Sequence, residues 1–170
     1  PLGFQHVCLM RTDTLDDPDS WRFWNGLDFT GVFVDPYRDD PEVVKRTTDC
    51  AAIALPEIAQ LYEGVTWNTH LDQYVMVGTS SDPSKDPNIF GVYYAFSDDL
   101  ITWQMRQPLL EARLPWRARG SDRTYLYPTL IDHNSTSRNF ETTGETAYLY
   151  LTRLNFGSGF LDRDLIRYPV

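Results

Sequence analysis

The sequence predicts an all-β fold in which one antiparallel unit is used more than once. Two stretches carry the same order of features: a β-forming run, a turn rich in aspartate, and a strand that opens on tryptophan. One runs from Val7 through Thr12 to Trp21, and the other from Val92 through Ser97 to Trp103. A unit repeated in this way is typical of repeat architectures built from antiparallel strands.

Composition limits the class of protein. The 170 residues are 42% hydrophobic and 14% aromatic, which is enough to bury a sizeable core in one domain spanning residues 1–170. A formal charge of -9, with 24 acidic and 15 basic residues, argues against a nucleic-acid partner. Because no apolar run reaches the roughly 20 residues that span a bilayer, we expect no membrane partner either. The compartment stays open, with secretion or a periplasmic location favoured over the cytoplasm.

The central part of the chain predicts one complete four-stranded antiparallel meander within residues 60–110. The first two strands are joined by the short polar connection 69–72, as in a β-hairpin. A turn at Ser97 separates the last two. The meander has about 45 residues, the size of a propeller blade. The expected strands are 64–68, 73–78, 91–97 and 102–107.

The two ends of the chain carry incomplete versions of this unit. Residues 1–30 match only its last two strands, whereas residues 123–170 predict three strands, at 125–132, 146–153 and 164–170. Between them, 28–63 is interpreted as an ordered insertion with short helical turns at 41–46 and 56–62. We therefore expect about half of a circular propeller, incomplete at both ends. Since proteins cover or pair open strand edges, a homo-oligomer or a complementary propeller half is expected.

The cysteines and histidines predict no metal site and no cofactor. Cys8 and Cys50 form either a disulfide or two buried thiols, and the sequence leaves both alternatives open. His6, His70 and His133 are expected to be structural, because no Cys/His cluster has the spacing of a zinc site. Nucleotide-binding and serine-hydrolase motifs are also absent from the sequence.

Four motifs, in the same order along the chain, resemble the five-bladed β-propeller glycoside hydrolases, broadly the family 43 type and its uncharacterised bacterial relatives. They lie at 17–26, 97–103, 127–132 and 148–153, and the resemblance covers nearly the whole chain, aligned with the C-terminal half of that fold. It implies a poly- or oligosaccharide ligand and O-glycosyl bond hydrolysis. The catalytic carboxylates of the family lie in earlier blades and have no match here, so the catalytic residues stay unknown. A non-catalytic sugar-binding or assembly module is the alternative, and a protein-interaction propeller is a third hypothesis.

The strand order implied by this resemblance separates a pocket side from a back side. Loops that lead into a first strand, or join a second strand to a third, surround the ligand. The carboxylates on these loops that are considered for catalysis are Glu111, Asp122 and Glu57. The residues expected to bind saccharide by stacking or hydrogen bonding are Trp67, Arg119, Arg123, Tyr125, Tyr127, Arg153 and Asn155.

Each of these assignments has a structural alternative. For Trp67 and Tyr127 it is ordinary packing, and for Arg123 and Arg153 it is an ion pair with a neighbouring acid. A basic cluster that could hold a carboxylate is formed by Arg113, Arg117, Arg119 and Arg123. The acids of the back-side loops are expected to accept backbone N–H bonds in tight turns; they are Asp13, Asp16, Asp17, Asp72, Asp98, Asp99, Asp132 and Glu141.

Overall fold

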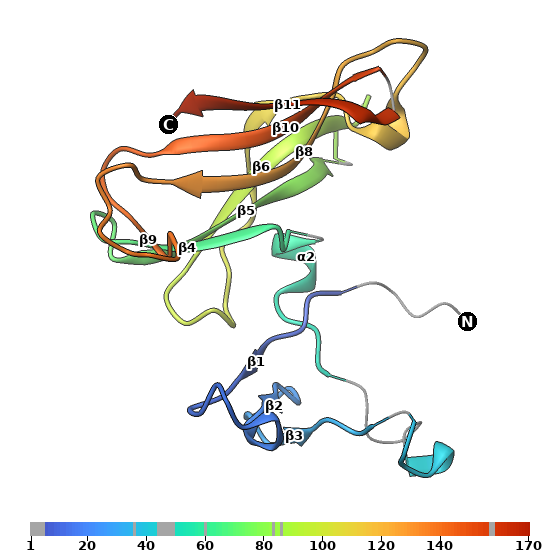
Figure 1. The fold of residues 1–170 in the computed structure, drawn as a ribbon, viewed down its shortest axis with the longest axis vertical. Helices are drawn as coiled ribbons and strands as arrows, with labels where there is room; N and C mark the ends of the chain where they lie inside the picture. Colours follow the sequence, from blue (N-terminus) through green and yellow to red (C-terminus); the bar gives the residue numbers. More distant parts are fainter. Residues whose placement is uncertain are drawn as a thin grey trace. The chain divides into compact units, whose positions relative to one another are not determined.

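The all-β prediction is confirmed: 42% of the computed structural model is strand and 9% is helix. The structure describes residues 6–35, 37–43, 50–59, 61–82, 84–85, 87–156 and 159–170 (Figure 1). The chain divides into two compact units, Pro1–Leu55 and Pro56–Val170, each of which is treated by itself below. The single-domain organisation stays a prediction. No helix in the described ranges has the length and apolar character needed to cross a membrane.

The first unit contains a small antiparallel sheet with the order β1-β2-β3. β1 (Met10–Arg11) and β2 (Arg22–Phe23) correspond to the two strands expected in residues 1–30, with the 3-10 helix η1 (Pro18–Ser20) between them. β3 (Gly31–Val32) was not expected. It fits beside β2 because a side chain at Gly31 would collide with the ring of Phe23.

Cys8 and Cys50 are joined by a disulfide, with their Cα atoms 5.9 Å apart. The alternative of two buried thiols is therefore wrong, and Cys8 is exposed. After Cys50 the chain returns along the small sheet, where Ala51 N–H donates to the Trp24 carbonyl at 2.9 Å. Because the strands of this sheet are only two residues long, a covalent tie contributes order that its few hydrogen bonds do not.

The second unit begins at Pro56, within the short helix α2 (Leu55–Ile58), and continues into the predicted meander. Its strands are β4 (Gly64–Asn68), β5 (Gln73–Asp82), β6 (Ile89–Ser97) and β7 (Gln107–Glu111), each antiparallel to the next. The first three strands lie where the sequence predicted them. α2 falls at the start of the helical turn predicted at 56–62; of the turn predicted at 41–46, residues 41–43 are helical and 44–46 lie outside the described residues.

The fourth predicted strand, 102–107, is wrong in position. Asp99 accepts the backbone N–H groups of Ile101 and Thr102 at 2.8 and 2.7 Å, and Trp103 then meets β6 through a single bridge to Ser97. Pairing with β6 does not resume until β7, because the N–H of Arg106 donates to the carbonyl of Glu57 at 3.0 Å. The tryptophan thus closes the turn, and the strand begins four residues later.

A fifth strand, β9 (Thr142–Thr143), pairs in parallel with β4 and was not predicted. Trp67 N–H donates to the Glu141 carbonyl, and Thr69 N–H to the Thr143 carbonyl, each at 2.8 Å. The sheet therefore has the order β7-β6-β5-β4-β9, and the edge of β4 is partly covered by a distant segment of the same chain.

The last three strands form a second sheet with the order β11-β10-β8, as the sequence predicted for residues 123–170. They are β8 (Thr124–Ile131), β10 (Tyr148–Phe156) and β11 (Gly159–Pro169). β11 starts five residues earlier than expected because it makes a long hairpin with β10. Within the described residues, the outer edge of β11 has no strand partner, and Leu161 and Leu165 on it are exposed.

The two sheets of this unit pack against each other. Figure 1 shows β8, β10 and β11 side by side, with β5 and β6 crossing behind them. Val92 on β6 and Leu149 and Leu151 on β10 are fully buried between them. The partly buried side chains around this cluster are Leu109, Leu110, Tyr125, Leu130 and Ile166. One of the sheets is curled like half a barrel. Burial of this apolar surface is the main force holding the sheets together.

We expect Gly91→Ala to lower the free energy of unfolding of the second unit by about 2–3 kcal/mol, because the added methyl would collide with the backbone of β7 at Leu110 and Glu111. Denaturant unfolding followed by tryptophan fluorescence measures the loss. The matched control is Gly120→Ala, which meets no atom within 4 Å and carries only the cost of its φ of +59°, about 1 kcal/mol. Equal losses in the two variants would contradict the close approach of β6 and β7.

Candidate functional site

A pocket of 680 Å³ opens in the second unit, between the start of β6 and the connection from β7 to β8. It is lined by Pro87, Asn88, Phe90, Glu111, Ala112, Arg113, Arg117 and Arg119. These residues come from the loop that joins the second strand of the meander to the third, and from the segment that leads into β8. They are the two kinds of loop that the sequence analysis placed on the ligand side, and Glu111 and Arg119 are two of the predicted site residues.

Backbone hydrogen bonds hold the walls of this pocket. Ala112 N–H donates to the Phe90 carbonyl at 3.0 Å, and Tyr125 N–H donates to the Arg113 carbonyl at 3.0 Å. The segment between them contains the 3-10 helix η2 (Pro115–Arg117), which is anchored by the fully buried side chain of Leu114. The arginines of the pocket are therefore presented by a segment fixed at both ends and in its middle.

Asp122 ties two of these arginines together. Its Oδ2 accepts the backbone N–H of Arg119 at 2.7 Å and forms an ion pair with the guanidinium of Arg113 at 2.5 Å. The hydrogen bond from Arg119 and the guanidinium of Arg113 together hold the pKa of Asp122 below its usual value. A carboxylate with a lowered pKa is a poor proton donor, so the geometry suits Asp122 to positioning the arginines better than to acid catalysis.

Arg117 and Glu111 complete the polar lining. The guanidinium of Arg117 lies over the ring of Phe90, 4.8 Å from its centroid, an arrangement in which ring and cation attract. Glu111 is exposed at the end of β7, opposite Gly91 in the register. The lining contains three arginines and one carboxylate, Glu111, and Asp122 pairs with Arg113 beside it, so the site keeps an excess of one positive charge.

Glu63 and Tyr127 mark a second polar arrangement, between β5 and β8. The carboxylate of Glu63 accepts the N–H and the hydroxyl of Thr79, and it also accepts a backbone hydrogen bond from Tyr127. Burial raises the pKa of Glu63 despite these bonds. Tyr127 lies where β8 bulges against β10; it has a φ of 55°, and its side chain is more than half exposed. A bulge next to a carboxylate of raised pKa is a feature of functional sites that the sequence pattern did not distinguish.

The other predicted binding residues lie outside the pocket lining. Trp67 packs edge-on against Tyr74, with ring centroids 4.7 Å apart, near the turn of the β4–β5 hairpin. Tyr125 on β8 lies opposite Arg153 on β10. Glu57 accepts the backbone of Arg106 through its carbonyl.

Arg153 and Asn155 both hold Asp164. Arg153 forms an ion pair with it at 2.7 Å, and the amide of Asn155 donates to it at 3.0 Å. Asn155 and then Arg153 lower the pKa of Asp164, and the nearby charge of Arg123 adds to this effect. For Arg153, the structure therefore contains the ion pair that was the structural alternative to a ligand role.

Of the acids predicted to accept backbone N–H groups in turns, Asp17, Asp99 and Asp132 do so, whereas Asp98 accepts the side-chain amide of Gln73. Asp17 caps η1 by accepting the N–H of Asp19 at 3.0 Å. Asp132 accepts the N–H groups of Asn134 and Gly144 at 2.7 and 2.9 Å. Together with Asp99, these carboxylates act as turn anchors.

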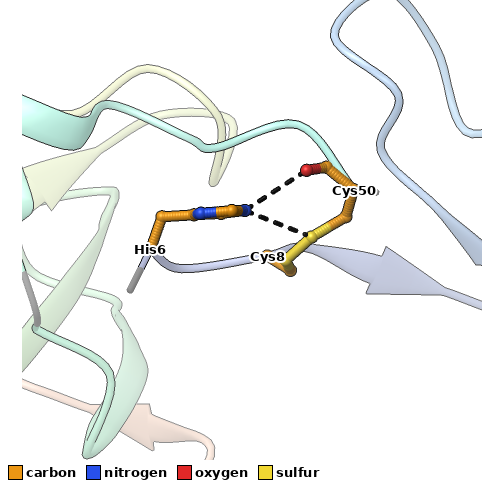
Figure 2. Close-up of side chains that lie close together, drawn as sticks. All are labelled: His6, Cys8 and Cys50. Atoms are coloured by element: carbon orange, nitrogen blue, oxygen red, sulfur yellow. Dashed lines mark hydrogen bonds between the residues drawn. A yellow bond between two sulfur atoms is a disulfide. The ribbon is translucent and has the colours of Figure 1, made fainter. Parts of the chain in front are cut away.

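The first unit contains a cluster that the sequence analysis missed. His6 was expected to stand alone, but its Nε2 lies 3.2 Å from the Cys50 carbonyl oxygen and 3.6 Å from the Cys50 sulfur. Figure 2 shows the imidazole directed at the disulfide between Cys8 and Cys50. The sequence pattern did not reveal this cluster because Cys50 lies more than 40 residues from His6 and Cys8 along the chain.

Comparisons with protein-family models, with curated proteins and with solved structures found no match to this chain.

Replacement of Glu63 by Gln is expected to change how stability depends on pH. Because the folded-state pKa of Glu63 is raised above its ordinary value of 4.5, its stabilising contribution is complete below that pH and is lost as the pH rises through the folded value. Relative to wild type, Glu63→Gln should therefore gain stability progressively above pH 4.5.

Thermal unfolding across about pH 4 to pH 8 measures this difference. The matched control is Glu145→Gln, which neutralises an exposed carboxylate and should leave the pH profile of the wild type unchanged. If stability depended on pH in the same way in the wild type and in Glu63→Gln, burial would not raise the pKa of Glu63.

Proposed function

We propose that this chain is a carbohydrate-binding segment of a β-propeller related to the glycoside hydrolases, and that it binds poly- or oligosaccharides bearing carboxylate groups. The observation that carries the proposal is the position and composition of the pocket. It lies between the two loops that surround the ligand in such a propeller, and three arginines line it. The packing of a four-stranded meander against a three-stranded sheet supports the propeller, since blades meet face to face in that architecture.

The arginines favour an acidic saccharide. A guanidinium matches a carboxylate with two parallel hydrogen bonds, and Asp122 fixes the segment that carries Arg113 and Arg119. Phe90, whose ring is covered on one face by Arg117, adds apolar surface to the lining, and apolar surface suits the C–H groups of a sugar ring. Uronic acid residues combine both features, and they are the ligand class that this lining suits best.

Binding without hydrolysis is the form of this function that the pocket supports by itself. Hydrolysis of a glycosidic bond uses two carboxyl groups on opposite sides of the bond, and Glu111 is the one carboxylate among the lining residues. A hydrolytic site would take its second carboxylate from another copy of the chain or from a complementary propeller half. The exposed outer edge of β11 is where such a partner would add a strand.

We expect the protein to bind oligogalacturonate, and to bind the same oligosaccharide at least about tenfold more weakly after its carboxyl groups are methyl-esterified. Isothermal titration calorimetry at low salt measures both affinities. The double variant Arg117→Gln/Arg119→Gln should lose about tenfold or more in affinity for the acid form only. Arg138→Gln removes one exposed cation outside the pocket and should change the affinity by less than about twofold.

The outcomes separate the parts of the proposal. Absence of binding to either form of the sugar would overturn the saccharide function, whereas equal binding of acid and ester would overturn only the acidic preference. Release of reducing ends, if abolished by Glu111→Gln, would show that the site is hydrolytic and not a binding module alone.

A further inference from the structure

We propose that, once the disulfide is reduced, His6, Cys8 and Cys50 form a binding site for a thiolate-preferring d10 cation of the Zn²⁺ class. This site lies in the first unit and does not depend on the proposed saccharide function. The three ligand atoms, one imidazole nitrogen and two sulfurs, lie within 4.8 Å of one another. Two thiolates and one imidazole are a known ligand set for zinc with one position left open.

The geometry matches the dimensions of a metal site. In a tetrahedron with Zn–S of about 2.3 Å and Zn–N of about 2.0–2.1 Å, neighbouring nitrogen and sulfur ligands are about 3.5 Å apart. The Nε2 of His6 lies 3.6 Å from the Cys50 sulfur, with the ring turned toward both sulfurs (Figure 2). A metal ion would therefore require the two sulfurs to move apart after reduction, while His6 keeps its distance from Cys50.

The spacing and exposure of His6 and Cys8 also allow a metal ion to reach them. His6 and Cys8 are two residues apart, the spacing at which side chains of an extended segment point to one side. Both residues are exposed, so a cation can reach them and a water molecule can fill the fourth position. The Cys8–Cys50 pair brings together segments that are 42 residues apart in the sequence, and a metal ion bound to both would preserve that tie.

The site forms in two separate steps, reduction of the disulfide and then binding of the cation. A dithiol reductant transfers two electrons and two protons to the S–S bond; it becomes a cyclic disulfide, and Cys8 and Cys50 become thiols. Zn²⁺ then displaces the two thiol protons, which go to solvent, and takes the neutral imidazole of His6 as its third ligand. A small-molecule disulfide reverses the process: it takes two electrons from the two thiolates and is itself reduced to two thiolates, while the Cys8–Cys50 bond re-forms and the cation is released.

The test compares the oxidised and the reduced form of the 170-residue chain; the reduced form is prepared with a water-soluble phosphine and desalted without oxygen. Zn²⁺ is titrated into each form in competition with a chromophoric chelator. We expect one Zn²⁺ per reduced chain and at least about a hundredfold weaker binding to the oxidised chain, whose sulfurs are in the disulfide. Titration with Cd²⁺ should produce sulfur-to-metal charge-transfer absorption in the reduced chain only.

Two histidine variants make the test specific. His6→Ala keeps both cysteines and should lower Zn²⁺ affinity about tenfold or more, whereas the matched control His70→Ala, in the β4–β5 turn, should leave it unchanged. Because the disulfide can still form in His6→Ala, this variant folds under the same covalent constraint as the wild type before it is reduced. The proposal is overturned if the reduced wild type binds Zn²⁺ no better than the oxidised form, or if His6→Ala binds as tightly as wild type.

Discussion

The apolar contact between the two sheets of the second unit is the constraint on which the candidate pocket depends. Val92, Leu149 and Leu151 form one cluster with almost no exposed surface, and this contact fixes where β6 and β10 cross. Since β8 is hydrogen-bonded to β10 and β7 to β6, the same contact sets the two ends of the connection 112–123. The arginines of that connection are held in place by packing some distance away from them.

Carboxylates stabilise the turns and connections between the packed strands. Asp99 and Asp132 close turns by accepting backbone N–H groups, and Asp122 does the same for the arginine segment. Glu63 differs, because it is half buried and joins β5 to the bulge of β8. The acidic composition of the chain is thus used partly for internal order. This explains how a protein with a net charge of -9 can still present a pocket lined by cations.

The sequence predicted strands well where alternation and a short turn coincide, as in the β4–β5 hairpin, and poorly where the pairing is not local. β9 has only two residues and gains its partner from β4, more than 70 positions earlier, so no local pattern marks it. β7 was misplaced because Trp103 resembles a strand residue, although its indole N–H is bonded to the Leu100 carbonyl within the turn. The pocket lies between loops that the loop order had assigned to a ligand side, an assignment that stays a prediction. The grouping of His6 with two cysteines required the folded chain.

The parallel pairing of β4 with β9 has a consequence for biosynthesis. The four strands of the meander leave the ribosome in order, and each can pair with its neighbour. One edge of β4, however, stays unpaired until residues 141–143 have been synthesised. A nascent chain halted before that point carries a sheet in which this edge of β4 is still unpaired. Non-local closure of this kind slows folding and gives chaperones a defined interval in which to act on the growing polypeptide.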